Sequence, residues 1–178
     1  MVNLNDLIVP GSEINMRFPM KINDRGEIGG VVLAAVLALT VIAWGADSNV
    51  GTWKLNLEKS KYSPGPTPKS QTLTIEASDG GIKYTSDGEN AEGSSVHVEF
   101  TAKYDGMDNP VTGSPAFDSI ALKRIDANTI ESTTKKDGTV MATSRTVISK
   151  DGKTRTVTIK GKNAKGQDVN NVVVYDKQ

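Results

Sequence analysis

The feature that most constrains the fold is a two-residue alternation of apolar and polar side chains, which recurs along most of the chain. It is clearest over residues 96–104, where the even positions are apolar and the odd positions are polar. Neighbouring side chains of a β-strand point to opposite faces, so this pattern predicts a strand with one buried face. On the same reasoning, Trp53, Leu55 and Leu57 are expected to share the buried face of a first strand. The alternation predicts nine strands in all, in or near residues 53–57, 73–75, 82–84, 96–104, 120–122, 129–135, 140–148, 155–159 and 169–175.

Turn signals lie between many of these segments. The five Asp-Gly pairs are at residues 79–80, 87–88, 105–106, 137–138 and 151–152. Because Asp-Gly accepts positive φ at little cost, the pairs predict hairpins between strands that are neighbours in sequence. Apolar residues at helical spacing with a cap are missing from residues 46–178, so helices are expected to be minor. The pattern predicts an all-β, antiparallel up-and-down β-barrel, and a β-sandwich is the alternative.

Two segments are expected to be irregular. Residues 63–68 contain three prolines, which cannot donate hydrogen bonds to a sheet, so this segment is expected to cross one end of the barrel as a loop. Residues 105–116 contain Pro110, Gly113 and Pro115 and are expected to form a second loop. Long loops in compact domains are often functional, and a plain surface excursion is the alternative for both.

The N-terminal region has the pattern of an export signal. Residues 31–43 are thirteen uncharged residues, preceded by Arg17, Lys21 and Arg25 and followed by the small residues Gly45 and Ala46. Crossing a bilayer takes about 20 apolar residues, so the run favours a secretory signal peptide over a membrane span. We therefore expect residues 1–45 to be a signal peptide, with an over-extended start, and residues 46–178 to be one periplasmic or secreted domain without a membrane span. An uncleaved anchor is the alternative.

Composition excludes several classes of function. Lys and Arg total 21 and Asp and Glu total 21, so the chain lacks the excess of positive charge that nucleic-acid binding requires. The absence of Cys removes disulfides, thiol nucleophiles and zinc-thiolate or iron–sulfur sites. The one histidine, His97, occupies a polar position of its strand and is expected to face solvent. No cofactor or metal site is expected, and an enzyme is not expected; a hydrolase with carboxylates from distant strands has no local pattern in its favour.

Short motifs carry a family resemblance. Gly51-Thr52-Trp53 near the start and Val172-Val173-Val174-Tyr175 near the end resemble the first and last strands of the lipocalin and fatty-acid-binding-protein (calycin) superfamily. A closer resemblance, which extends over essentially all of 46–178 and includes Ser63-Pro64-Gly65-Pro66, is to a family of small exported bacterial proteins with no assigned activity. These resemblances imply a lipocalin-like barrel outside the cytoplasm.

The fatty-acid-binding resemblance also implies a site. Proteins of that family hold a ligand carboxylate with inward arginines and an Arg-x-Tyr on the last strand. The resemblance places Arg145 at one of these arginines and Tyr175 at the tyrosine, whereas Val173 replaces the other arginine. The proline-rich loop stands where that family has a helical lid, so an open mouth or a filled interior is expected.

Strand register leads to a different arginine. A two-residue turn at Asp151-Gly152 would pair Ile148 with Arg155, which turns Arg155 inward and Arg145 outward, the reverse of the resemblance. A buried guanidinium needs an anionic partner, and a ligand carboxylate is one; a salt bridge to a neighbouring strand, or exposure near the rim, is the alternative for either arginine. The candidate ligand-binding residues are Trp53, Phe100, Arg145, Arg155 and Tyr175. We expect an exported carrier for a small apolar or acidic amphipathic molecule; the alternative is a ligand-free envelope module that binds another protein.

Overall fold

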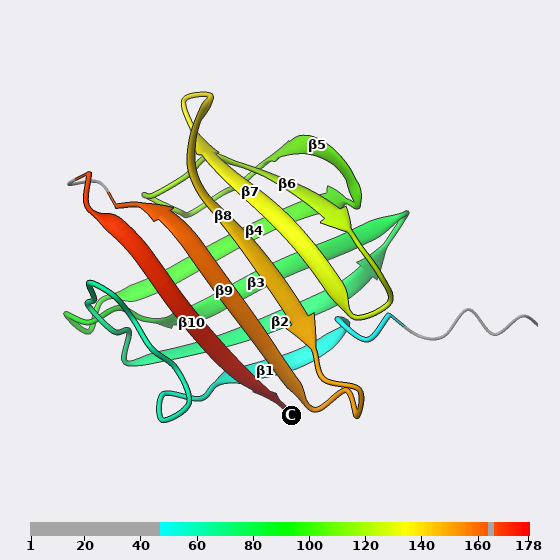
Figure 1. Ribbon diagram of the computed structural model, residues 1–178, viewed down its shortest axis with the longest axis horizontal. Coiled ribbons are helices and arrows are strands. Elements are labelled where there is room, and N and C mark those ends of the chain that lie inside the picture. Colours follow the sequence, from blue (N-terminus) through cyan, green and yellow to red (C-terminus); the bar gives the residue numbers. More distant parts are fainter. Residues whose placement is uncertain (1–46, 164–165) are drawn as a thin grey trace, which may run out of the picture. The chain divides into compact units, whose positions relative to one another are not determined.

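The computed structural model describes residues 47–163 and 166–178, which form ten β-strands and no helix (Figure 1). The expected signal peptide, residues 1–45, lies outside the described residues. Within the described ranges, no helix has the length and apolar character needed to span a membrane. The strands are β1 (Gly51–Leu55), β2 (Ser70–Ser78), β3 (Gly81–Glu89), β4 (Ser95–Lys103), β5 (Asp105–Pro110), β6 (Ser119–Arg124), β7 (Thr129–Lys136), β8 (Thr139–Ile148), β9 (Thr154–Lys162) and β10 (Asp168–Lys177).

The ten strands form one antiparallel sheet that curves into a nearly closed barrel (Figure 1). The order is β4-β3-β2-β1-β10-β9-β8-β7-β6-β5, so β1 pairs with β10 and brings the two ends of the domain together. Between β4 and β5 there is no ladder, and a single bridge from Glu99 to Thr112 links this side. The predicted up-and-down barrel is confirmed, and the sheet is not split into the two layers of a sandwich.

The strand count is ten instead of nine because residues 105–110 form β5, where a loop was predicted. This strand has almost no buried face, and its register with β6 shifts between Asp105 and Asp108. A strand that buries neither face has no reason to alternate apolar and polar residues. The remaining residues of the predicted loop, 111–116, do form a connection outside the named strands.

Three of the five Asp-Gly pairs lie at hairpin turns, as predicted: 79–80, 137–138 and 151–152. The pair at 87–88 does not, because it lies inside β3. Gly88 is required there for close packing, since a Cβ atom at this position would lie 2.2 Å from the backbone oxygen of Ser70. The following turn uses residues 90–94 instead. The pair at 105–106 begins β5.

The hydrophobic core fills one end of the barrel. Trp53 is fully buried there, as predicted, and its Nε1 donates a 2.9 Å hydrogen bond to the backbone oxygen of Asn49. Leu55 is also buried, but Leu57 is 43% exposed, so its predicted place on the same face is wrong. The reason is that β1 ends at Leu55 and Leu57 begins a turn, in which the backbone N–H of Ser60 donates to the backbone oxygen of Leu57.

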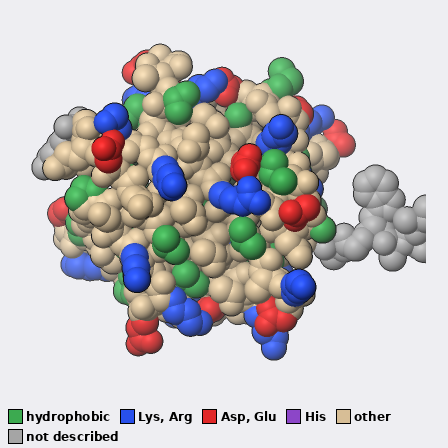
Figure 2. Space-filling model, in the orientation of Figure 1, with side chains coloured by type: hydrophobic (Ala, Val, Ile, Leu, Met, Phe, Trp, Pro, Cys, Tyr) green, Lys and Arg blue, Asp and Glu red, His purple; other side chains and the backbone are tan. Residues whose placement is uncertain are grey.

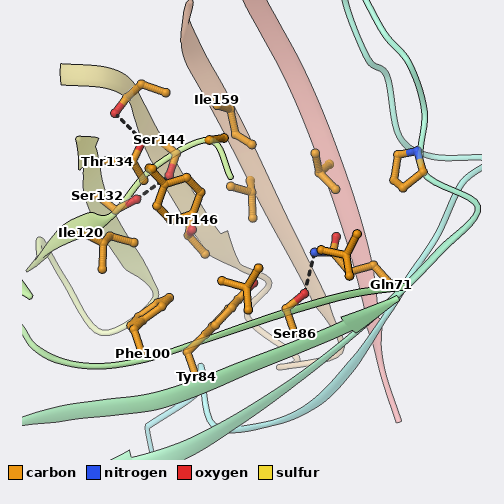
Figure 3. A pocket seen from close by; sticks show the side chains of 18 of the residues that line it. Gln71, Tyr84, Ser86, Phe100, Ile120, Ser132, Thr134, Ser144, Thr146 and Ile159 are labelled. Atoms are coloured by element: carbon orange, nitrogen blue, oxygen red, sulfur yellow. Dashed lines mark hydrogen bonds between the residues drawn. The ribbon is translucent and has the colours of Figure 1, made fainter. Parts of the chain in front are cut away.

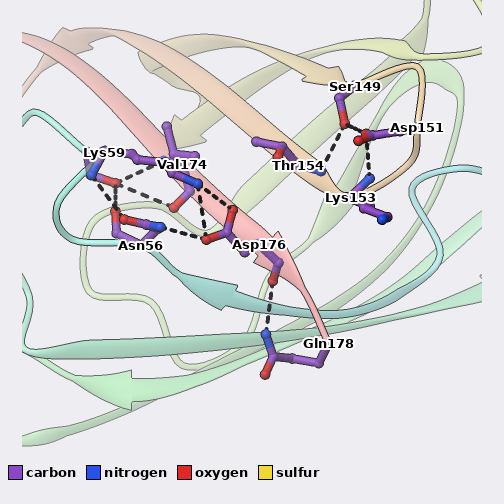
Figure 4. A network of polar contacts seen from close by, with 10 residues as sticks. Asn56, Lys59, Ser149, Asp151, Lys153, Thr154, Val174, Asp176 and Gln178 are labelled. Carbon is purple, nitrogen blue, oxygen red and sulfur yellow. Dashed lines mark hydrogen bonds and ion pairs between the residues drawn. The ribbon is translucent and has the colours of Figure 1, made fainter.

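The loop after β1 is tied to the outer side of β10 (Figure 4). Asn56 Nδ2 donates to Asp176 Oδ2 at 2.6 Å, and Lys59 Nζ lies 3.2 Å from Asp176 Oδ1. Ser60 Oγ accepts a 2.9 Å hydrogen bond from the backbone N–H of Val174. These contacts cover Val174, which is 7% exposed although it points away from the interior.

Residues that precede β1 close the barrel at the core end. The Tyr104 hydroxyl donates to Asp47 Oδ2 at 3.0 Å, and Arg124 forms an ion pair with the same carboxylate. Asn49 Nδ2 donates to the Tyr104 hydroxyl at 3.3 Å, and Ser48 Oγ donates to the backbone of the β6–β7 turn. This network holds Asn49, which is 1% exposed, across the closed end.

Candidate ligand-binding site

The barrel contains an internal cavity of about 650 Å³ between the core end and the opposite, looped end. That volume falls within the range of about 300–1,000 Å³ found for small-molecule pockets. At the looped end, which we call the mouth, the lining includes Pro68, Asn90, Pro115 and Lys136, and the deep end is lined by Arg155. Most of the wall is apolar, and its aliphatic and phenyl side chains include Ile82, Val96, Val98, Phe100, Ile120, Leu122, Ile130, Val157, Ile159 and Val173.

Arg155 projects into the deep end from β9. The β8–β9 ladder pairs Ile148 with Arg155, as the turn at 151–152 predicted. Asp151 stabilises that turn by accepting hydrogen bonds from Ser149 Oγ and from the backbone N–H of Lys153 (Figure 4). This turn therefore sets the register that directs Arg155 inward.

The guanidinium of Arg155 has little protein compensation. The Nε of Arg155 donates to Asn49 Oδ1 at 3.2 Å, and the Cζ of Arg155 lies 5.7 Å from the ring centroid of Tyr175. Among the described residues no carboxylate pairs with it, and its two terminal nitrogens have no hydrogen-bond partner. In the described residues, every fully buried side-chain nitrogen has a hydrogen-bond partner. The two terminal nitrogens of Arg155 have none, so they are not fully buried and are exposed to the cavity. Arg155 is nevertheless only 9% exposed.

A chain of hydrogen bonds lines the wall beside Arg155. The Tyr175 hydroxyl donates to Gln71 Oε1 at 2.7 Å, and Gln71 Nε2 donates to Ser86 Oγ at 2.8 Å (Figure 3). Burial raises the pKa of Tyr175 and of Tyr84, and the charge of Arg155 offsets part of that rise. Both phenols therefore stay protonated at neutral pH, and no negative charge in this group neutralises Arg155.

Hydroxyl groups occupy the opposite wall, formed by β7 and β8 (Figure 3). Ser132 Oγ and Ser144 Oγ lie 2.6 Å apart, and Thr134 Oγ1 donates to the backbone oxygen of Ala142 at 3.3 Å. Thr146, which is 5% exposed, lines the cavity deeper along β8. Sequence reasoning missed these residues, although they share the strand faces of Ile130 and Ile148 and could have been found from that phase.

The predicted site residues separate into three groups. Arg155, Tyr175 and Phe100 line the cavity together, with the Phe100 ring stacked on Tyr84 at 4.6 Å between centroids. Trp53 belongs to the core below the cavity and is not among its lining residues. Arg145 lies on the outside of the barrel.

The inward position that the family resemblance implies for Arg145 is wrong, and the outward position expected from the strand register agrees with the structure. Its side chain is 53% exposed, and Nη1 lies 2.8 Å from Glu131 Oε1 on the neighbouring strand. The cause is an irregularity in the β7–β8 ladder, where Lys135 pairs with Val140 but Thr134 pairs with Ala142. One extra residue in β8 reverses the face of every later residue of that strand, so Arg145 points outward.

Charges on the outer surface are mixed in sign. On the face drawn in Figure 2, Lys and Arg side chains are interspersed with Asp and Glu side chains. His97 faces outward, as predicted, with Nδ1 2.7 Å from Asp87 Oδ1, and this hydrogen bond raises the pKa of His97. No group of three or more His, Asp or Glu residues in the described ranges could hold a metal ion.

Comparison with known proteins finds likenesses among solved structures only. No protein-family model and no curated protein matches the chain. Among solved structures, the chain is similar to a zebrafish ileal bile acid-binding protein crystallised with cholic acid, at 16% sequence identity and a TM-score of 0.47. The match covers 74% of this chain and 99% of the zebrafish chain. The sheet order itself, a nearly closed antiparallel barrel, agrees with the resemblance to the calycin superfamily.

Proposed function

We propose that this protein is an exported carrier that holds a small amphipathic acid inside its barrel, with the acid group at Arg155. The observation that carries the proposal is a guanidinium at the deep end of an otherwise apolar cavity, without a carboxylate partner among the described residues. A ligand carboxylate there would accept hydrogen bonds from the two terminal nitrogens of Arg155. The apolar body of the ligand would lie against Phe100, Val157 and Ile159.

The energetics favour an anion over a neutral group at this position. A charge-assisted hydrogen bond contributes about 1.5–3 kcal/mol, roughly twice the contribution of a bond between neutral groups. Without an anion, Arg155 relies on Asn49 and on solvent that enters from the mouth. An acid is therefore expected to bind about tenfold or more tightly than its alcohol, which corresponds to about 1.4 kcal/mol.

The test is a titration of delipidated protein with hexadecanoic acid, hexadecanol and the methyl ester of the acid. Arg155→Met, which keeps a long apolar side chain, is expected to reduce affinity for the acid to that of the alcohol. Arg145→Met is the matched control, because this arginine lies on the outer face and should leave all three affinities unchanged. If none of these ligands binds, or if the acid binds equally well to the Arg155→Met protein, the carrier proposal fails.

Export is a second part of the proposal, supported by the thirteen uncharged residues at 31–43 and the small residues that follow them. N-terminal sequencing of protein recovered outside the cytoplasm is expected to begin near Ala46 or Asp47. Recovery of an intact chain in the membrane fraction would contradict it.

A further inference from the structure

One side of the cavity carries a row of hydroxyl groups that the proposed acid site does not use. Ser132, Thr134, Ser144 and Thr146 all line the cavity from β7 and β8 (Figure 3). The register places Ser132 directly opposite Ser144. Thr146 pairs with Val157 on β9, which is two residues from Arg155. The row therefore extends from beside Arg155 toward the mouth.

The other sides of the cavity differ in character. β3 and β4 contribute Ile82, Val98 and the stacked rings of Tyr84 and Phe100. β9 and β10 contribute Val157, Ile159 and Val173 besides Arg155, Lys162 and Tyr175. Apart from the Tyr175–Gln71–Ser86 chain, whose groups bond to one another, a ligand in this cavity would thus meet a polar edge on the β7–β8 side and mainly apolar side chains elsewhere.

The hydroxyl row keeps unused hydrogen-bonding capacity. Two hydroxyls carry two protons, and the single 2.6 Å contact between Ser132 and Ser144 uses only one of them. Thr146 Oγ1 has no hydrogen-bond partner among the described residues. An unsubstituted alkyl chain against this wall would leave these groups desolvated and unpaired, which is unfavourable.

We infer that the preferred ligand carries hydroxyl groups along one edge of its apolar body, and that these face the β7–β8 wall. The inference rests on the proposed function, because it assigns the acid group to Arg155. With a rise of about 3.4 Å per residue, Thr146 and Ser144 lie about 7 Å and about 14 Å along β8 from the level of Arg155. The hydroxyls of the ligand are therefore expected in the middle of the molecule, away from its acid group.

The test compares hexadecanoic acid with a hexadecanoic acid that has two adjacent mid-chain hydroxyls. The two probes share the acid group and the chain length. The wild-type protein is expected to bind the dihydroxy acid about 5-fold more tightly, the effect of a net hydrogen bond. The double variant Ser132→Ala/Ser144→Ala should bind the dihydroxy acid and hexadecanoic acid with about equal affinity. Its affinity for hexadecanoic acid should be retained or increased.

Thr133→Val is the matched control, because Thr133 lies on the same strand and is not among the cavity-lining residues. It should keep the full preference for the dihydroxy acid. Equal affinities for the two acids in the wild-type protein, or a preference that survives the double variant, would overturn the inference and leave the acid carrier intact. If Arg155→Met does not weaken binding of either acid, the proposed function itself fails.

Discussion

Replacing Trp53 by alanine tests whether the register of β1 is as described. Trp53 is the largest of the fully buried side chains in the described structure, and its indole N–H donates to the backbone oxygen of Asn49. A buried aromatic side chain removes about 150–250 Å² from water, worth about 4–6 kcal/mol at 25 cal/mol per Å². Part of this surface is already covered in the unfolded chain, so Trp53→Ala is expected to lower the free energy of unfolding by about 3–5 kcal/mol.

Urea denaturation of the 46–178 chain, followed by circular dichroism, measures this loss. Lys54→Ala is the control, because Lys54 is the exposed neighbour of Trp53 on the same strand and should change stability by less than about 0.5 kcal/mol. Trp53→Phe should lie between the two, since it keeps an aromatic ring but leaves the Asn49 oxygen without its donor. A loss below about 1 kcal/mol for Trp53→Ala would refute the burial argument.

Three further predictions concern other parts of the barrel. Gly88→Ala should destabilise the fold by about 2 kcal/mol in urea denaturation, because its Cβ would meet the backbone oxygen of Ser70; an unchanged midpoint would contradict that close approach. The pKa of His97 is raised by its hydrogen bond to Asp87. The stability that this contact provides should therefore be complete below the unfolded pKa of about 6.5 and be lost as the pH rises through the higher folded pKa. NMR titration should show the raised pKa of His97, and Asp87→Asn should remove this increase. Burial raises the pKa of all the tyrosines, that of Tyr62 to about 12, so tyrosinate absorbance should stay low at pH 10 in the folded protein; half-ionisation at pH 10 would refute their burial.

The sequence was sufficient to predict the barrel because most strands bury one face. Where that condition fails, prediction fails too: β5 (Asp105–Pro110) exposes nearly all of its side chains and was predicted as a loop. Asp87-Gly88 is predicted as a turn because glycine is favoured where a turn needs positive φ. In the structure Gly88 lies inside β3, where glycine is needed because there is no room for a Cβ atom. Local sequence does not distinguish these two needs.

The candidate site shows the same limit. Arg155 could be placed from the short turn that precedes it, since the register from Ile148 onward is regular. The same register directs Arg145 outward, whereas the family resemblance implies the opposite face, because the extra residue in β8 changes the phase of the strand after the 137–138 turn. The hydroxyl row escaped notice because serine and threonine at inward positions look like the ordinary polar half of an alternating pattern.

The pairing of β1 with β10 has a consequence for how the barrel assembles. The seam joins Trp53 to Lys177 and Leu55 to Tyr175, so the first strand meets its second partner only after the last strand is available. Contacts between such distant parts of a chain form slowly, because a large loop must be closed before any contact compensates for the lost entropy. Until then Trp53 has only β2 beside it, and the apolar interior is open to water. We therefore expect this seam to close late in folding, and the chain to be most vulnerable to proteases and to self-association before it closes.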